Sequence, residues 1–269
     1  MIFFSGKELS QKITYLKSQG KELNLSINYP KKFEFFVKFY ISMFGIPEIG
    51  FQERFNFFQR CIKGLSGKIF IDAGCGNGAY SRFMAKKYPQ SKIIAFDFEK
   101  KLVTLAKELT NQKRINFFTH DLTTNNGRLL KQADIVWSLD VLEHIKDYEK
   151  AVKNLTLMVK KNGYLILHVP LINQRRWFGY FNDWTHETHE REGFEKKQIT
   201  NLLKGFQIIK EVNTFGSIGS FIWELNIILF KYLPPVGALL FPLLRMVLYF
   251  DRLISSKKYN CLGILAQKL

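Results

Sequence analysis

Cysteine is scarce in this sequence, and its few cysteines follow no recognised pattern. The chain of 269 residues has 3 of them, Cys61, Cys75 and Cys261, with no Cys-x-x-Cys pair. This spacing favours neither a disulfide framework nor a zinc site, and it predicts a protein of a reducing compartment. A secretory leader is not expected either, because the apolar start at residues 1–4 is short and is soon followed by charged residues. We therefore expect a cytoplasmic location.

Acidic residues are also few. The chain has 23 of them against 40 lysines and arginines, which gives a formal net charge of +17. Such a charge favours anionic partners, such as nucleic acid, acidic lipid or phosphorylated compounds. The lysines are spread as pairs rather than gathered into one block, and this favours a solvated basic surface over a nucleic-acid face. Hydrophobic residues make up 46% of the chain, so a folded protein with an ample core is expected.

Three of the 18 glycines stand at alternate positions in one short stretch, at 74, 76 and 78. The apolar residues 69–71 and Asp72 precede it, and a helical pattern begins at Ala79, so the stretch predicts a buried strand, a tight loop and a helix start. Glycines allow the backbone to approach a ligand closely, and the helix start offers unpaired N–H groups. Asp72 can accept hydrogen bonds from a ligand ammonium. The spacing Gly-x-Gly-x-Gly differs from that of dinucleotide sites and suits a cationic amino-acid ligand better.

Apolar strands then alternate with helices along the chain. Strands are expected at residues 68–72, 92–97, 115–120, 135–139 and 164–169, and helices at 52–62, 79–88, 100–110 and 148–159. The last of these helices is expected to stop at Lys160-Lys-Asn-Gly163, where glycine suits a left-handed cap. This order predicts an α/β fold with a parallel, doubly wound sheet. The first three strands are followed by Asp72, Asp97 and Asp121. Ligands bind outside the carboxyl ends of such strands, so the site is expected at this edge.

Four motifs together carry a family resemblance. Asp72-Ala-Gly-Cys-Gly-Asn-Gly78, Asp97, Asp121 and Val141-Leu-Glu-His-Ile145 resemble the class I S-adenosylmethionine-dependent methyltransferases. Within them, the chain looks like the small-molecule branch that includes quinone-biosynthesis and type 11 methyltransferases. The resemblance covers roughly residues 55–207 and returns at the last strand. It implies a mostly parallel, seven-stranded Rossmann-like sheet, with N-terminal helices and a helical insertion before the last strand.

The resemblance also implies S-adenosyl-L-methionine as cofactor and S-adenosyl-L-homocysteine as product. Asp72 and the loop glycines would take the methionine end, Asp97 the ribose hydroxyls and Asp121 the adenine amino group, while Leu139 and Asp140 would line the methyl-bearing face. The residues expected to bind the cofactor are Asp72, Ala73, Gly74, Gly76, Gly78, Asp97, Phe98, Asp121, Leu122, Leu139 and Asp140.

Four segments are expected along the chain: an N-terminal helical extension at residues 1–64, the cofactor-binding core at 65–215, an apolar insertion at 216–258 and the last strand at 259–269. The extension would cover the site or pack on the core. The insertion has no charge at residues 232–244, but Pro234, Pro235 and Pro242 argue against a membrane-spanning helix. A helical hairpin is expected, packed against the core, against a second copy in a homodimer, or against a membrane surface through residues 216–250.

The acceptor is expected beside residues 171–193, which are rich in aromatic and titratable groups. In the resembling family this segment carries a histidine and basic residues near the acceptor, which points here to Trp184, His186 and Arg191. If the acceptor atom is a hydroxyl oxygen, His144 or His189 could take its proton. The histidine spacing also allows a metal site or plain loop ion pairs, and no metal is expected.

The function expected from the sequence is methyl transfer to oxygen, with nitrogen or carbon as lesser alternatives, of a small or lipid-like acceptor. A nucleic-acid methyltransferase is the main alternative, favoured by the charge. Against it, the segment that begins at Leu139 lacks the Asn/Asp-Pro-Pro-aromatic loop that grips a flipped base. The glycine spacing and the lack of a Tyr-x-x-x-Lys pair disfavour a dehydrogenase. A non-catalytic module that binds S-adenosylmethionine stays open.

Overall fold

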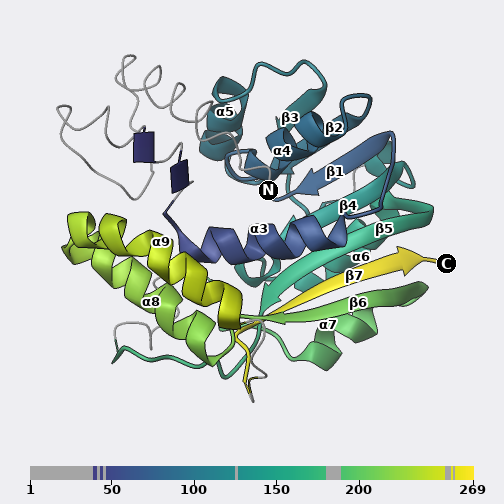
Figure 1. Cartoon of the computed structure of the whole chain (residues 1–269). Coiled ribbons are helices and arrows are strands. Elements are labelled where there is room, and N and C mark those ends of the chain that lie inside the picture. The colour runs from purple at the N-terminus through teal and green to yellow at the C-terminus, as the bar shows by residue number, and fades with distance from the viewer. Residues whose placement is uncertain are drawn as a thin grey trace.

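One seven-stranded sheet forms the centre of the computed structural model, which describes residues 39–40, 43–44, 47–124, 127–179, 189–251, 256 and 258–269. The strands are β1 (Ile69–Ala73), β2 (Lys92–Asp97), β3 (Ile115–Thr119), β4 (Ala133–Leu139), β5 (Val159–Pro170), β6 (Phe206–Thr214) and β7 (Cys261–Lys268). Their order is β3-β2-β1-β4-β5-β7-β6 (Figure 1). β7 runs antiparallel to β5 and β6, and the other neighbours are parallel. The predicted fold class is confirmed.

Helices cover both faces of this sheet. They are α3 (Ile49–Cys61), α4 (Ala79–Lys87), α5 (Lys100–Glu108), α6 (Tyr148–Met158), α7 (Lys196–Leu202), α8 (Ser217–Tyr232) and α9 (Pro234–Asp251). Residues of α3, α4 and α5 form one buried cluster with the strands, and residues of α6 and α7 form another on the opposite face. The central strands β1 and β2 are buried almost throughout, because both of their faces are covered.

One local prediction was wrong. The sequence suggested that the helix at residues 148–159 ends in a loop capped by Gly163, but β5 already begins at Val159. A Cβ at Gly163 would lie 2.9 Å from the carbonyl oxygen of Ala133 on the neighbouring strand. Glycine is therefore needed for close strand contact where the β4–β5 register shifts, and not for a left-handed cap.

The expected helical hairpin is present between β6 and β7 as α8 and α9, which lie side by side next to α3 (Figure 1). A third buried cluster joins the hairpin to Ile49 of α3. The Tyr40 hydroxyl donates a hydrogen bond of 2.6 Å to the carbonyl of Ala238 in α9. Of the N-terminal helical extension expected at residues 1–64, residues 1–38, 41–42 and 45–46 lie outside the described residues.

Candidate active site

The glycine loop joins β1 to α4 with three left-handed backbone positions. Gly74, Gly76 and Gly78 have φ angles of 83°, 51° and 75°. A Cβ at Gly74 would lie 2.3 Å from Cγ2 of Val141, so this glycine allows the loop to pass close to the end of β4. A Cβ at Gly76 would meet nothing within 4 Å. The backbone of Gly76 is therefore exposed to open space, as a cradle for a ligand requires.

Asp97 at the end of β2 fixes this loop. One carboxylate oxygen accepts a hydrogen bond of 2.8 Å from the N–H of Gly76, and the other accepts one of 2.9 Å from the N–H of Glu99. The carboxylate lies at the carboxyl edge of the sheet beside the pocket, where the sequence predicted a contact with ribose hydroxyls. The side chain that fixes the loop is thus the one that the sequence predicts to contact the ligand.

Asp72 at the end of β1 is almost fully buried. It accepts a hydrogen bond of 2.6 Å from the hydroxyl of Ser81 in α4. Burial raises the pKa of Asp72 to about 7, and the nearby carboxylate of Asp97 adds to the rise, while the hydrogen bond from Ser81 opposes it. A ligand ammonium group at this position would stabilise the charged carboxylate, which fits the role that the sequence assigned to Asp72.

Asp121 and its neighbours form the far end of the site. One oxygen of Asp121 accepts hydrogen bonds of 2.8 Å from both the N–H and the hydroxyl of Thr123. Asp121 and Leu122 line the pocket together with Phe98, whose side chain is 76% exposed. An exposed aromatic ring and a carboxylate that line one pocket suit the stacking and hydrogen bonding of a purine base. Ala73 of β1 and Gly78 of the glycine loop were also expected to bind the cofactor, but neither residue lines the pocket.

These residues share one pocket of about 1480 Å³. The pocket continues from the glycine loop past Leu139 and Asp140 to a second wall, which α8 supplies with Trp223, Ile227 and Phe230. Asn226 of α8 also lines the pocket, and its side-chain oxygen accepts a hydrogen bond of 3.2 Å from the N–H of Ile49. The polar half therefore lies at the sheet, and a more apolar half lies at the hairpin.

Asp140 is the centre of a polar network between the two halves. Its backbone is left-handed, with φ 52°. The side chain accepts a hydrogen bond of 2.9 Å from Arg54 of α3 and a short one from Nδ1 of His168 in β5. His168 in turn contacts the hydroxyl of Thr214 in β6 at 2.9 Å through Nε2. Burial alone would raise the pKa of Asp140, but His168 and Arg54 outweigh it and lower this pKa to about 2.

The sequence missed three members of this network. Arg54, His168 and Thr214 come from a helix and two strands, and none of them belongs to a local motif. The buried histidine within the expected strand at 164–169 was the one available signal, since a fully buried imidazole needs polar partners.

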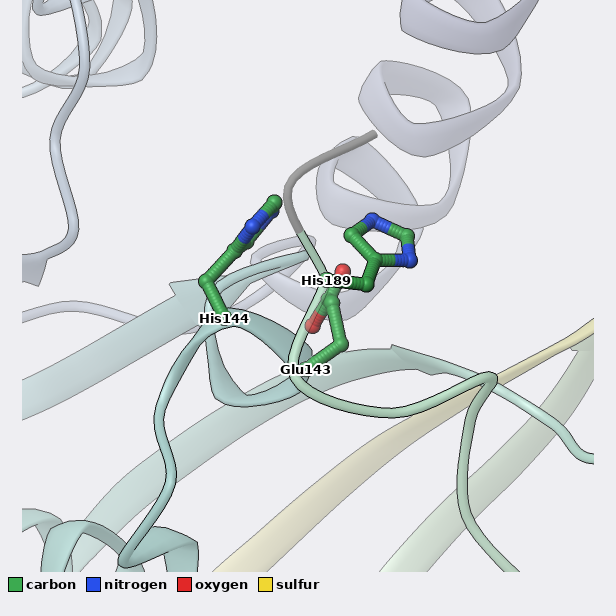
Figure 2. A group of neighbouring side chains, drawn as sticks. All are labelled: Glu143, His144 and His189. Atoms are coloured by element: carbon green, nitrogen blue, oxygen red, sulfur yellow. The ribbon is translucent and has the colours of Figure 1, made fainter. Parts of the chain in front are cut away.

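Glu143, His144 and His189 form a cluster at the rim of the pocket (Figure 2). Glu143 and His144 belong to the short helix η3 (Leu142–His144), and a hydrogen bond of 2.9 Å from the N–H of Glu190 to the carbonyl of Glu143 brings the His189 segment beside it. The two imidazole rings meet edge to face, with centroids 4.6 Å apart. Burial lowers the pKa of His189 to about 4, and the neighbouring His144 and Arg176 also lower it.

The cluster brings together both histidines that the sequence singled out as bases, although the base role itself stays a prediction. The donor atoms of Glu143, His144 and His189 lie within 4.8 Å of one another, so these residues could also hold a metal ion. The expectation of a site without metal likewise stays a prediction.

Of the three residues expected to contact the acceptor, Arg191 alone belongs to the part of the chain that the structure describes. Trp184 and His186 lie outside the described residues. Arg191 donates hydrogen bonds of 2.7 and 2.9 Å to the carbonyls of Ile145 and Lys146. Its guanidinium lies over the ring of Tyr148 at 4.4 Å. Arg191 thus supports the loop that carries His144 and does not line the pocket.

The fold is that of the class I S-adenosylmethionine-dependent methyltransferases, as the sequence predicted. The chain belongs to a methyltransferase domain family, whose sequence model matches residues 51–241. S-adenosylmethionine is accordingly the cofactor of this domain. The open backbone of Gly76 and the carboxylates of Asp72, Asp97 and Asp121 line the pocket, and their binding of the cofactor stays a prediction.

The chain is similar to curated ubiquinone biosynthesis O-methyltransferases. The protein of Proteus mirabilis is 25% identical over 127 residues, which are 46% of this chain and 51% of that protein. The protein of Coxiella burnetii is 31% identical over 106 residues, which are 38% and 43% of the two chains. The chain spans about half the length of the curated relatives that it matches.

Solved structures show the same fold. The phosphoethanolamine N-methyltransferase 2 of Haemonchus contortus, in complex with S-adenosyl-L-methionine, has a TM-score of 0.61 and 16% identity, covering 87% of this chain and 56% of that one. The N-methyltransferase NodS of Bradyrhizobium japonicum has a TM-score of 0.53 and 13% identity, covering 82% and 87%. At sequence identities this low, the similarity shows only that the fold is shared.

Proposed function

We propose that this protein transfers a methyl group from S-adenosylmethionine to an oxygen atom of a small or lipid-like acceptor. The observation that carries the proposal is the two-sided pocket. Its volume of about 1480 Å³ exceeds the several hundred Å³ of a typical single-ligand site, so it has room for a donor and an acceptor together. One side offers carboxylates and open backbone, and the other offers the aromatic and aliphatic side chains of α8.

The tasks that the protein must perform follow from the choice of an oxygen atom as the methyl acceptor. S-adenosylmethionine, when bound, supplies a methyl group that is already activated on a sulfonium. The protein must hold the acceptor oxygen in line with this group and must remove the proton of an acceptor hydroxyl. The cluster of His144 and His189 lies at the pocket and is assigned this proton. A pKa of about 4 keeps His189 neutral at pH 7 but also makes it a weaker base than an ordinary histidine, so the role is assigned to the pair with His144 and not to His189 alone.

The relatives support oxygen as the acceptor atom only through their names, because ubiquinone biosynthesis O-methyltransferases match about half of their own length. Asp140 argues against the nucleic-acid alternative. A flipped base would need a free polar group after β4, but Asp140 is engaged with Arg54 and His168. We therefore favour a small-molecule acceptor with an apolar body, in the cytoplasm or at its membrane surface.

Methyl-labelled S-adenosylmethionine tests this proposal. The purified protein is incubated with the donor and a cell-envelope lipid extract, a water-soluble metabolite extract or RNA, and labelled products are identified by mass spectrometry. We expect an O-methylated product from the lipid extract, with a rate at least tenfold lower for His189→Gln and unchanged for the exposed control Lys101→Ala. Label found in RNA would overturn the proposal. Tight S-adenosylhomocysteine binding without a labelled product would instead indicate a binding module.

A further inference from the structure

One face of the α8–α9 hairpin is exposed although it is strongly apolar. Val236, Leu239, Leu243, Met246 and Phe250 follow one another at intervals of three or four residues, so they form a stripe along one side of α9. All of them are exposed, with Leu239 at 78% and Met246 at 54%. A surface helix of a globular protein normally shows polar residues on this side.

The stripe continues around both ends of the helix. Exposed Tyr232 and Leu233 form the turn between α8 and α9, and exposed Tyr249 lies beside Phe250 near the end of α9. We call these residues the outer face: Tyr232, Leu233, Val236, Leu239, Leu243, Met246, Tyr249 and Phe250. A continuous apolar surface of this kind marks an interaction site.

The opposite side of α9 is fixed in the protein. Gly237, Phe241, Leu244 and Leu248 are buried against α8 and α3. The carboxylate of Asp251 accepts hydrogen bonds of 3.1 Å from the N–H groups of Gly216 and Ile218. α9 has 18 residues and a mean hydropathy of 1.2, which is enough for a span by length and composition, but such a helix is weak grounds for one. A span would expose the buried side to lipid and break these hydrogen bonds.

The net charge of the chain distinguishes between the partners that could bind this apolar face. Each chain carries a formal net charge of +17, so two copies brought together at this face would repel each other. The same charge attracts a bilayer that contains anionic lipids, and basic residues near such a surface strengthen the binding of an amphipathic helix. An anionic bilayer is thus the partner that suits both the apolar face and the charge.

The hairpin also connects this face with the pocket. Trp223, Ile227 and Phe230 of α8 line the apolar half of the pocket, and Lys231 at the end of α8 lines it too, directly before the turn that begins the outer face. The outer face therefore comes next to the apolar half of the pocket at the turn between α8 and α9.

From these observations we infer that the outer face of the α8–α9 hairpin docks on the surface of an anionic bilayer, with α9 lying in the plane of the membrane. Docking would bring the pocket to a lipid-like acceptor. Only this last step rests on the proposed function, because the docking itself requires no methyl transfer.

Vesicle sedimentation with the full chain tests the inference. The probes are vesicles of phosphatidylcholine alone and vesicles that also contain phosphatidylglycerol. The test variant replaces Leu239, Leu243 and Met246 by serine, and the matched control is Ile209→Ser, which changes an exposed apolar residue on β6. We expect the wild type and the control to bind the anionic vesicles, and the triple variant to bind at least tenfold more weakly.

Binding of S-adenosylhomocysteine by calorimetry confirms that each variant is folded. Three results would overturn the inference. The wild type could bind neither kind of vesicle, or the triple variant could bind the vesicles as well as the wild type does. Light scattering could also show that the wild type is a dimer and the triple variant a monomer. This last result would show that the outer face binds a second copy of the chain. A missing methylated product would leave vesicle binding unaffected, so the failure of the proposed function can be told apart from the failure of docking.

Discussion

Arg54 donates a hydrogen bond of 2.9 Å to the carboxylate of Asp140, and this contact joins α3 to the end of β4 across 86 positions of sequence. Both side chains are only 24% exposed. Asp140 has a second partner in His168, which in turn contacts Thr214. A helix that precedes the sheet is thereby tied to three of its strands at the pocket, so the shape of the site depends on where α3 docks.

Replacing Arg54 by methionine should destabilise the protein. The substitution leaves a largely buried carboxylate with one cationic neighbour fewer, and removing one partner of such a pair costs about 2 kcal/mol when the pair is partly exposed. Urea unfolding followed by circular dichroism measures this loss. The double variant with Asp140→Asn serves as the control, and it should lose less than the sum of the two single variants. Additive losses would show that the two side chains do not interact.

Asp140 should also make the protein sensitive to acid. Its pKa is about 2 in the folded chain, against about 3.9 for an unfolded aspartate. A depressed pKa stabilises the folded state above the unfolded value, and this contribution is lost as the pH falls from about 4 to about 2. We expect Asp140→Asn to have a flatter stability profile than the wild type across this window in urea titrations. Parallel profiles would contradict the assigned pKa.

The features that the sequence predicted are local ones. Three apolar residues before Asp72, the alternate glycines and the helical spacing after them specify a strand, a loop and a helix without reference to the rest of the chain. The acids that follow the first three strands were then placed at one edge by the rules of parallel sheets. Gly163 was misread because its role depends on a carbonyl of the neighbouring strand, which no local pattern contains.

Features that depend on how the helices pack on the sheet and on one another could not be predicted in the same way. Arg54 reaches Asp140 only because α3 packs across the sheet. His144 and His189 were both named as bases, but their contact results from the backbone hydrogen bond between Glu190 and Glu143. The sequence also did not show which side of α9 would form the outer face. This helix is apolar on all sides, so the position of α8 and α3 decides which side is buried.

Gly74→Ala should abolish cofactor binding. The substituted Cβ would lie 2.3 Å from Val141 and would also strain a backbone with φ 83°. Gly64→Ala is the matched control, because Gly64 has φ 82° but nothing within 4 Å of the substituted Cβ. Strain alone costs roughly 1 kcal/mol, so the control should melt slightly earlier and still bind S-adenosylhomocysteine normally. In calorimetry we expect no measurable binding to Gly74→Ala and partial recovery when Val141 is also replaced by alanine. Equal behaviour of the two glycine variants would assign the effect to strain.

Zinc should inhibit methyl transfer, and a chelator should leave it unchanged. If the histidines act as bases, they need no metal, so EDTA should not change the rate with the acceptor that the labelled-donor experiment identifies. Neutral imidazoles are good zinc ligands, and the pKa of about 4 keeps His189 neutral and able to bind zinc at pH 7. With Glu143 and His144, it offers three donor atoms within 4.8 Å of one another. Micromolar zinc should therefore bind to the wild type in calorimetry and at least tenfold more weakly to His189→Gln. Loss of activity in EDTA that zinc or magnesium restores would instead make the cluster a metal site.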